Sequence, residues 1–156
     1  MMGRVAGGAA LLLVLLAAAA QAREHVDARD YPSPGAGRVA FERMERDLVR
    51  GFDDICGDTF CEGEFFNLRA LQLRCAVAAD DGTVAGCLWS FAGSDAYVLA
   101  DVAVPQVHAR TYACALPLAP GTSMEALLRT LVGRDALHTP LPGTRSTSYD
   151  GLIGCL

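Results

Sequence analysis

Residues 71–91 read LQLRCAVAADDGTVAGCLWSF, and this stretch predicts a β-hairpin. Apolar residues alternate with more polar ones before the Asp80-Asp81-Gly82 segment, which is typical of a strand with one buried face. That segment supplies a three-residue loop with glycine where the backbone needs a positive φ. The facing pairs are then Ala79 with Thr83, Val77 with Ala85, Cys75 with Cys87, Leu73 with Trp89 and Leu71 with Phe91. The register therefore predicts a disulfide between Cys75 and Cys87.

An amphipathic helix is expected over residues 39–55. Its apolar residues recur every three or four positions, and charged residues occupy most positions between them. These apolar residues are Phe41, Met44, Leu48, Phe52 and Ile55. The helix precedes the hairpin and presents one stripe to a core, in which we also expect Phe65, Phe66, Trp89 and Phe91.

A second hairpin is expected over residues 97–118, with its turn at Pro105-Gln106. This register opposes Asp101 to Arg110, Leu99 to Tyr112 and Tyr97 to Cys114. A helix follows that begins at Thr122, has a capping box with Glu125, and ends at Gly133. The tail after it is rich in proline, glycine and serine and is predicted to be loop-like, held in place by Cys155.

The order of elements predicts an α+β fold. An amphipathic helix, a four-stranded antiparallel meander, a short C-terminal helix and a disulfide-tied tail are most simply packed as a sheet with helices on one face. In outline only, this order resembles cystatin-like folds, in which a helix precedes a meander.

The N-terminal residues predict export. A short basic start, an apolar run over residues 5–20 and the sequence Ala20-Gln21-Ala22 are typical of a signal peptide, cleaved after Ala22. Residues 23–37 hold Pro32 and Pro34 and are predicted to be a flexible lead-in to a single domain over residues 38–156. We therefore expect a periplasmic or secreted protein. All 13 basic residues are arginine, which indicates a GC-rich coding bias of the kind found in many bacteria.

Six cysteines follow the expected cleavage site, at positions 56, 61, 75, 87, 114 and 155. In an oxidising compartment an even set of this kind is expected to form disulfides rather than a metal site. The predicted bridges are Cys75–Cys87 from the hairpin register, Cys56–Cys61 from proximity and Cys114–Cys155 as the remaining pair.

Charge and motifs exclude several classes of function. The chain has 13 basic and 18 acidic residues, a net charge of −5, and loss of Arg4 with the leader makes it −6. This balance argues against nucleic acid or a membrane as a partner of the mature chain. The histidines, His25, His108 and His138, form no metal-spaced pair, and no nucleophile motif is present. We expect no enzyme activity and no cofactor.

The most unusual segment is the acidic stretch over residues 53–64, which contains a Cys-x4-Cys pair and two glycines. A small closed loop lowers the conformational cost of binding, with Thr59 and Phe60 expected at its exposed apex. Its spacing is similar to a loop that some bacterial periplasmic lysozyme inhibitors insert into their target, although the basic and histidine residues of that loop are absent. The predicted partner-binding residues are Asp58, Thr59, Phe60, Glu62 and Glu64.

Two other interpretations of this segment stay open. The carboxylates can simply face water, or they can bind calcium in an irregular loop, since the ligand positions of an EF-hand are not matched. A strand face around Asp101, His108 and Arg110 is the next candidate site. The expected function is a small exported binding module with a positively charged protein as partner, in its most specific form an inhibitor of a basic hydrolase. The alternative is a calcium-dependent structural or adhesion domain; the oligomeric state and any metal remain open.

Overall fold

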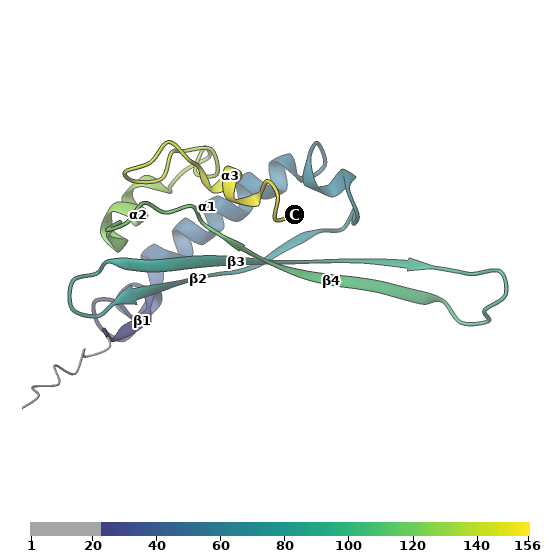
Figure 1. Ribbon diagram of the computed structural model, residues 1–156, viewed down its shortest axis with the longest axis horizontal. Helices are drawn as coiled ribbons and strands as arrows, with labels where there is room; N and C mark the ends of the chain where they lie inside the picture. The colour runs from purple at the N-terminus through teal and green to yellow at the C-terminus, as the bar shows by residue number, and fades with distance from the viewer. Residues whose placement is uncertain (1–22) are drawn as a thin grey trace, which may run out of the picture.

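A computed structural model describes residues 23–156, and the predicted signal peptide, residues 1–22, lies outside the described residues. A four-stranded antiparallel sheet carries helices on one face, which confirms the α+β prediction (Figure 1). The strands are β1 (His25–Asp27), β2 (Arg69–Ala78), β3 (Val84–Tyr97) and β4 (Gln106–Ala115), paired in that order. The helices are α1 (Arg38–Cys56), α2 (Met124–Thr130) and α3 (Ser148–Leu152), with short 3-10 helices η1 (Ala28–Asp30) and η2 (Phe60–Glu62). Within residues 23–156, no helix has the length and apolar character needed to span a membrane.

The first hairpin has the predicted central register. Cys75 pairs with Cys87 and Leu73 with Trp89, and Gly82 in the turn has a φ of 75°. One irregularity in β2, at Leu71, and one in β3, at Ala85, shift the pairs at the ends, so that Ala70 faces Phe91 and Val84 faces Val77. Because a bulge moves one residue out of the alternation, Leu71 is 56% exposed instead of buried.

The predicted second hairpin is wrong. Strand β3 continues without a break to Tyr97 and pairs directly with β4, with Tyr97 opposite Gln106 and Trp89 opposite Cys114. The turn therefore occupies residues 98–105, and the pairs proposed for Asp101, Leu99 and Tyr97 do not form. Strand β3 can continue past the body because Gly93 lies under the ring of Phe65, where a Cβ atom would clash.

The N-terminal segment also differs from its prediction as a flexible lead-in. Within residues 23–37, β1 pairs with β2, and Ala28 of η1 is buried in the core. A strand of three residues is too short to show a hydrophobic period in the sequence. It forms because it pairs with the free edge of β2. Strand β1 thus completes the four-stranded sheet as the edge strand beside β2.

Helix α1 lies across the sheet as its period predicts. Its inward side chains are fully buried against the central strands and, with them, form the core. The largest of these side chains are Phe41, Met44, Leu48, Phe52, Leu73, Trp89 and Phe91. A buried carboxylate, that of Asp47, accepts a hydrogen bond from the Gly133 backbone N–H at 2.8 Å, so α1 also holds the segment that follows α2.

The C-terminal region has more helix than predicted. The N-cap of α2 lies one residue later than expected, because the Ser123 hydroxyl caps the helix by accepting from Ala126 N at 3.2 Å, and the helix begins at Met124. The Thr122 hydroxyl instead donates to the Ala119 carbonyl. The tail predicted to be loop-like contains α3, which has a capping box formed by Thr147 and Asp150.

All three predicted disulfides are present. Cys56–Cys61 closes the acidic loop, Cys75–Cys87 crosses the first hairpin, and Cys114–Cys155 ties the tail to β4. Since no cysteine in the chain is left free, this set fits an extracellular or otherwise oxidising compartment.

Candidate functional site

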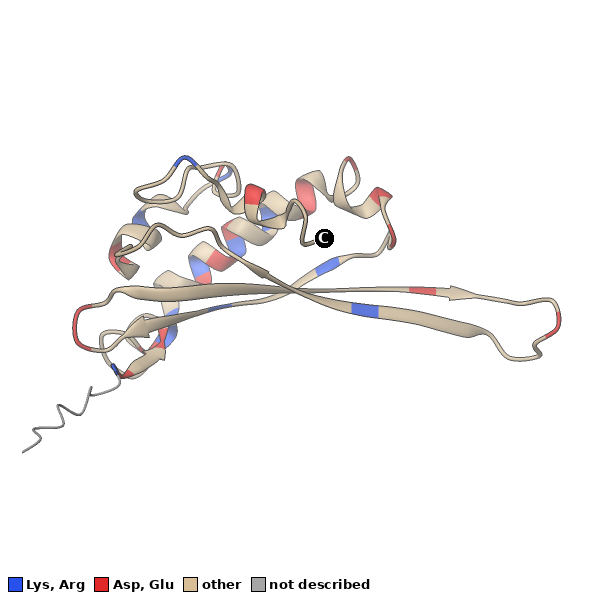
Figure 2. Ribbon diagram, in the orientation of Figure 1, with Lys and Arg blue, Asp and Glu red and all other residues tan. Residues whose placement is uncertain are grey.

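The acidic segment lies at the C-terminal end of α1, where acidic side chains gather (Figure 2). The disulfide between Cys56 and Cys61 is buried, and the residues between them turn outward. Four carboxylates, those of Asp53, Asp54, Asp58 and Glu62, belong to exposed residues. None of the four forms a salt bridge with another residue in the described range 23–156. We call these four residues, together with Phe66, the acidic end.

The apex of the loop is only partly as predicted. Thr59 is exposed, and its hydroxyl donates to the Ile55 carbonyl at 2.8 Å. Phe60 is half-buried: its ring lies 5.9 Å from that of Phe52 and 5.6 Å from that of Tyr149. The ring therefore anchors the loop on the core, and the loop has two attachments, one covalent and one aromatic.

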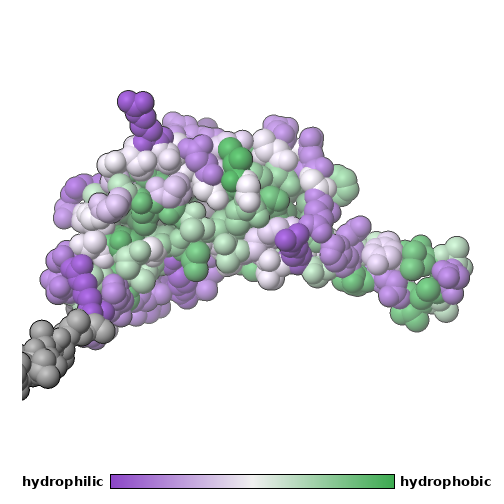
Figure 3. Space-filling view, in the orientation of Figure 1, coloured by the Kyte–Doolittle hydropathy of each residue, from purple (hydrophilic) through white to green (hydrophobic). Residues whose placement is uncertain are grey.

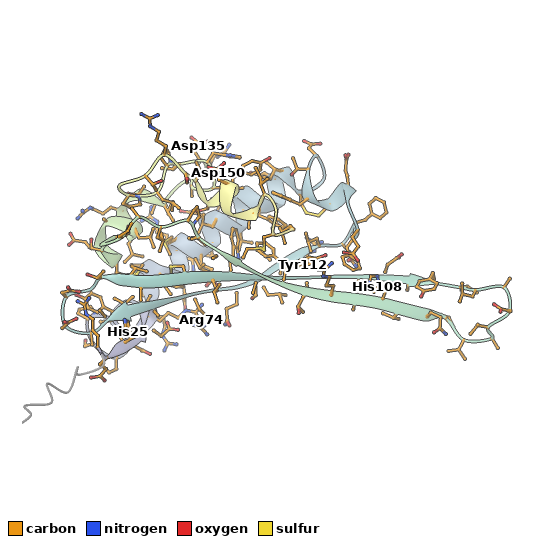
Figure 4. All side chains as sticks on the ribbon, in the orientation of Figure 1. His25, Arg74, His108, Tyr112, Asp135 and Asp150 are labelled. Atoms are coloured by element: carbon orange, nitrogen blue, oxygen red, sulfur yellow. A yellow bond between two sulfur atoms is a disulfide. The ribbon has the colours of Figure 1, made fainter. Side chains whose placement is uncertain are left out.

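Glu64, a predicted partner-binding residue, is already bound within the chain. Its carboxylate accepts from the Tyr112 hydroxyl at 2.9 Å and from the Arg110 guanidinium at 3.2 Å. The Tyr112 hydrogen bond is the main cause that lowers the pKa of Glu64. Desolvation opposes it, and the hydrogen bond and charge of Arg110 lower the pKa further. Desolvation and the hydrogen bond to Glu64 raise the pKa of Tyr112. Glu64 thus connects the acidic loop to β4, where Figure 4 shows Tyr112 and His108 along one strand.

The alternative site on the strand face is only partly assembled. Arg110 and His108 both approach Glu64, with the His108 Nε2 atom 3.7 Å from the carboxylate. Asp101 lies in the turn after β3 and does not join them. This cluster connects two elements and lacks the nucleophile–base arrangement that acyl or phosphoryl transfer needs.

Two neighbouring phenylalanines have opposite environments. Phe65 is buried over Gly93 and the His108 ring, as expected for core. Phe66 is 83% exposed, which contradicts its expected place in the core. Two adjacent aromatic residues in an irregular segment show no hydrophobic period. The sequence therefore gave no signal for which of the two is buried and which is exposed.

A second exposed feature was missed by the sequence analysis. Beyond Ala92, where the pairing of β3 with β2 ends, β3 and β4 continue as a two-stranded ribbon that projects from the body (Figure 1). We call residues 93–110 the arm. Its outer end is largely hydrophobic (Figure 3). The exposed large apolar residues of the arm are Tyr97, Val98, Leu99, Val104 and Val107.

The part of the chain that the structure describes contains no preformed metal site. Over residues 23–156, no group of three or more His, Cys, Asp or Glu side chains is placed so that it could hold a metal ion. The carboxylates of the acidic end point to solvent separately.

Comparison of the chain with protein family models, with curated proteins and with solved structures found no match.

Proposed function

We propose that the chain is an exported binding module that captures a positively charged protein through its acidic end. The observation that carries the proposal is a group of four exposed carboxylates without a salt-bridge partner in the described range, with the exposed ring of Phe66 four residues after Glu62. The carboxylates steer a basic partner toward this end and raise the rate of association. Phe66 supplies the apolar anchor that binding hot spots usually contain.

Preorganisation supports the same proposal. The Cys56–Cys61 bridge, the packed ring of Phe60 and the Glu64 contacts hold the loop from three sides. A loop that is already ordered loses little conformational entropy on binding. This arrangement suits recognition by a small fixed surface better than it suits a flexible tether.

The proposed location is the periplasm or the medium of a bacterium. Three disulfides and the signal peptide predicted over residues 1–22 support export. The most specific form of the proposal is an inhibitor: a convex acidic loop enters the cleft of a basic hydrolase and excludes its substrate, with no catalysis by the module itself.

Binding to two basic hydrolases, a c-type lysozyme and a pancreatic ribonuclease, tests the proposal by surface plasmon resonance. The test variant is Asp58→Asn with Glu62→Gln, which removes two charges from the acidic end without disturbing Phe60. The matched control is Glu24→Gln with Asp135→Asn, which removes two charges elsewhere on exposed residues.

We expect the parent and the control to bind at least one of the two hydrolases, and the test variant to associate about tenfold more slowly. The difference should shrink as salt is added. An equal decrease in association rate in the test and control variants would mean that binding depends on net charge alone and not on the acidic end. Failure of the parent to bind either hydrolase would refute the inhibitor form of the proposal.

A further inference from the structure

The arm ends in a turn over residues 98–105 that has exposed apolar side chains on more than one side. Tyr97 and Val107 lie on opposite faces of the ribbon, because the residue that pairs with Tyr97 is the one before Val107 and side chains alternate along a strand. Val98 and Val104, in the turn itself, are 73% and 65% exposed. A flat surface could cover only one of these sides, so a partner that buries them has to enclose the turn.

The backbone of the turn also needs a partner when water is removed. Within residues 98–105, one hydrogen bond joins two backbone groups, from the Val102 N–H to the Leu99 carbonyl at 3.1 Å. A side chain supplies one more, since the Gln106 amide donates to the Val104 carbonyl at 2.9 Å. Most other N–H and C=O groups of the turn depend on water, which the hydrocarbon of a membrane cannot replace. The enclosing partner must therefore pair with the backbone as well as with the apolar side chains.

A cleft that binds an extended segment of polypeptide meets both needs. Such a cleft adds the segment as a strand through main-chain hydrogen bonds and accepts its side chains in pockets. The turn is an internal segment, and its two ends are paired in β3 and β4, so the cleft has to accept a chain that continues at both ends. The substrate cleft of an endopeptidase is a site of this kind.

Val98 is the residue best placed for the primary pocket of such a cleft. It follows Tyr97, the last residue of β3, and is the most exposed large apolar residue of the arm. In a substrate-like complex, the carbonyl of the residue in the primary pocket must be free to accept hydrogen bonds from the enzyme. The Leu99 and Val104 carbonyls already accept hydrogen bonds within the chain, whereas the Val98 carbonyl accepts none from the described residues.

We propose that the turn of the arm inhibits an endopeptidase that cleaves after small aliphatic residues, with the Val98 side chain in the primary pocket of the enzyme. A short branched side chain fits a shallow apolar pocket. Residues 93–109 contain no lysine or arginine, so the arm offers nothing to the primary pocket of a trypsin-like enzyme. The arm occupies the cleft and excludes the substrate.

Inhibition rather than rapid cleavage follows from how the turn is held. Tyr97, before Val98, is paired with Gln106, and Leu99, after it, is hydrogen-bonded to Val102. A segment that is already ordered loses little conformational entropy on binding. If water hydrolysed the bond after Val98, these contacts would still hold both new ends, so the cleaved chain would leave the cleft slowly. The turn therefore suits an inhibitor better than a substrate.

Inhibition of neutrophil elastase, which cleaves after valine, tests this proposal, with trypsin as the second enzyme. The parent should compete with a peptide substrate of elastase and should not inhibit trypsin. Val98→Lys should weaken inhibition of elastase by about a hundredfold or more, because it brings an unpaired charge to an apolar pocket. The same variant should inhibit trypsin, whose pocket accepts lysine. The matched control, Val107→Lys, changes an equally exposed valine outside the turn and should inhibit elastase as the parent does.

The acidic end takes no part in this inference, which does not depend on the proposed function. The variant Asp58→Asn with Glu62→Gln should therefore inhibit elastase as strongly as the parent. A loss of inhibition in that variant would assign the effect to charge attraction at the acidic end and would overturn the proposal. Near-ultraviolet circular dichroism of Trp89 verifies that each variant is folded.

Other results would also overturn the proposal. These are a parent that does not inhibit elastase, a Val98→Lys variant that inhibits it equally well, and rapid cleavage of the parent after Val98 without inhibition, detected by mass spectrometry. A parent that inhibits neither enzyme but floats with phosphatidylcholine vesicles would assign the arm to a lipid surface instead. A parent that inhibits neither enzyme but forms a dimer in sedimentation equilibrium, lost in Val98→Lys, would assign the arm to a second copy.

Discussion

The acidic loop and the arm both project from the same body, and they are held in opposite ways. The loop is fixed by a disulfide, by the ring of Phe60 and by the contacts of Glu64, and it exposes mainly charge. The arm is held by the pairing of two strands, and it exposes mainly apolar side chains. A solvated carboxylate needs no cover, whereas a cluster of exposed valines and leucines does. The loop can therefore make ionic contacts, whereas the arm can make apolar contacts.

The largest effect is expected where the loop joins the core. Phe52 contacts the ring of Phe60 on one side and those of Trp89 and Phe91 on the other. Replacing Phe52 with alanine should cost about 3–5 kcal/mol in the free energy of unfolding, because it leaves a cavity in a fully buried site. Urea denaturation measures this, and a loss below about 1 kcal/mol would show that the loop and the core are not packed as one unit.

The disulfides of the tail and of the acidic loop should contribute differently to the free energy of unfolding. Cys114–Cys155 spans 41 residues and Cys56–Cys61 spans 5. On the chain-entropy model, replacing the first pair with alanines should cost about 4 kcal/mol and replacing the second about 2 kcal/mol. Thermal unfolding of both double variants checks the order. The reverse order would mean that the acidic loop contributes more to global stability than its size allows.

Phe60 in the loop and Phe66 after it form a matched pair. Phe60→Ala should lower stability by about 1–3 kcal/mol, since it removes a ring packed on Phe52. Phe66→Ala should change stability by less than about 0.5 kcal/mol, because that side chain is exposed, but it should weaken partner binding. Chemical denaturation and partner binding, measured on the same samples, separate a role in stability from a role in binding. Loss of stability in Phe66→Ala and loss of binding alone in Phe60→Ala would contradict these assignments.

The smallest effect concerns the link between the loop and the arm. Because the folded-state pKa of Glu64 is lowered, the contribution of this link is present above the unfolded-state pKa of glutamate and is lost as pH falls through the lower folded-state value. The carboxyl resonance of Glu64 in NMR should titrate below that of a model glutamate, and Tyr112→Phe should move it back. An unchanged midpoint in Tyr112→Phe would show that the Tyr112 hydroxyl does not set this pKa.

Local signals in the sequence determined what could be predicted. The hairpin around Gly82 and the Cys75–Cys87 disulfide followed from one turn and its register. The other two disulfides followed from proximity and from elimination, and α1 followed from its period. Strand β1 could not be found, because three residues show no period and need the edge of β2. The arm was missed because Pro105 was taken as a tight turn, which started a separate hairpin at Tyr97 and hid the continuation of β3.

The candidate site was predicted at the level of the segment and less well at the level of side chains. The exposed carboxylates of Asp58 and Glu62 follow from the polar character of the loop. The inward turn of Phe60 and the capture of Glu64 by Tyr112 depend on α3 and β4, which are distant in sequence. Contacts of that kind are set by tertiary packing and leave no local pattern.

Hydrogen exchange followed by mass spectrometry compares the two regions in a single measurement. Before a partner is added, backbone amides of residues 57–64 and of the arm give the reference level of protection. Addition of a bound basic hydrolase should then protect residues 57–64 and leave the arm as it was. Protection of the arm by the hydrolase, or no change at residues 57–64, would contradict the assignment of the basic partner to the acidic end.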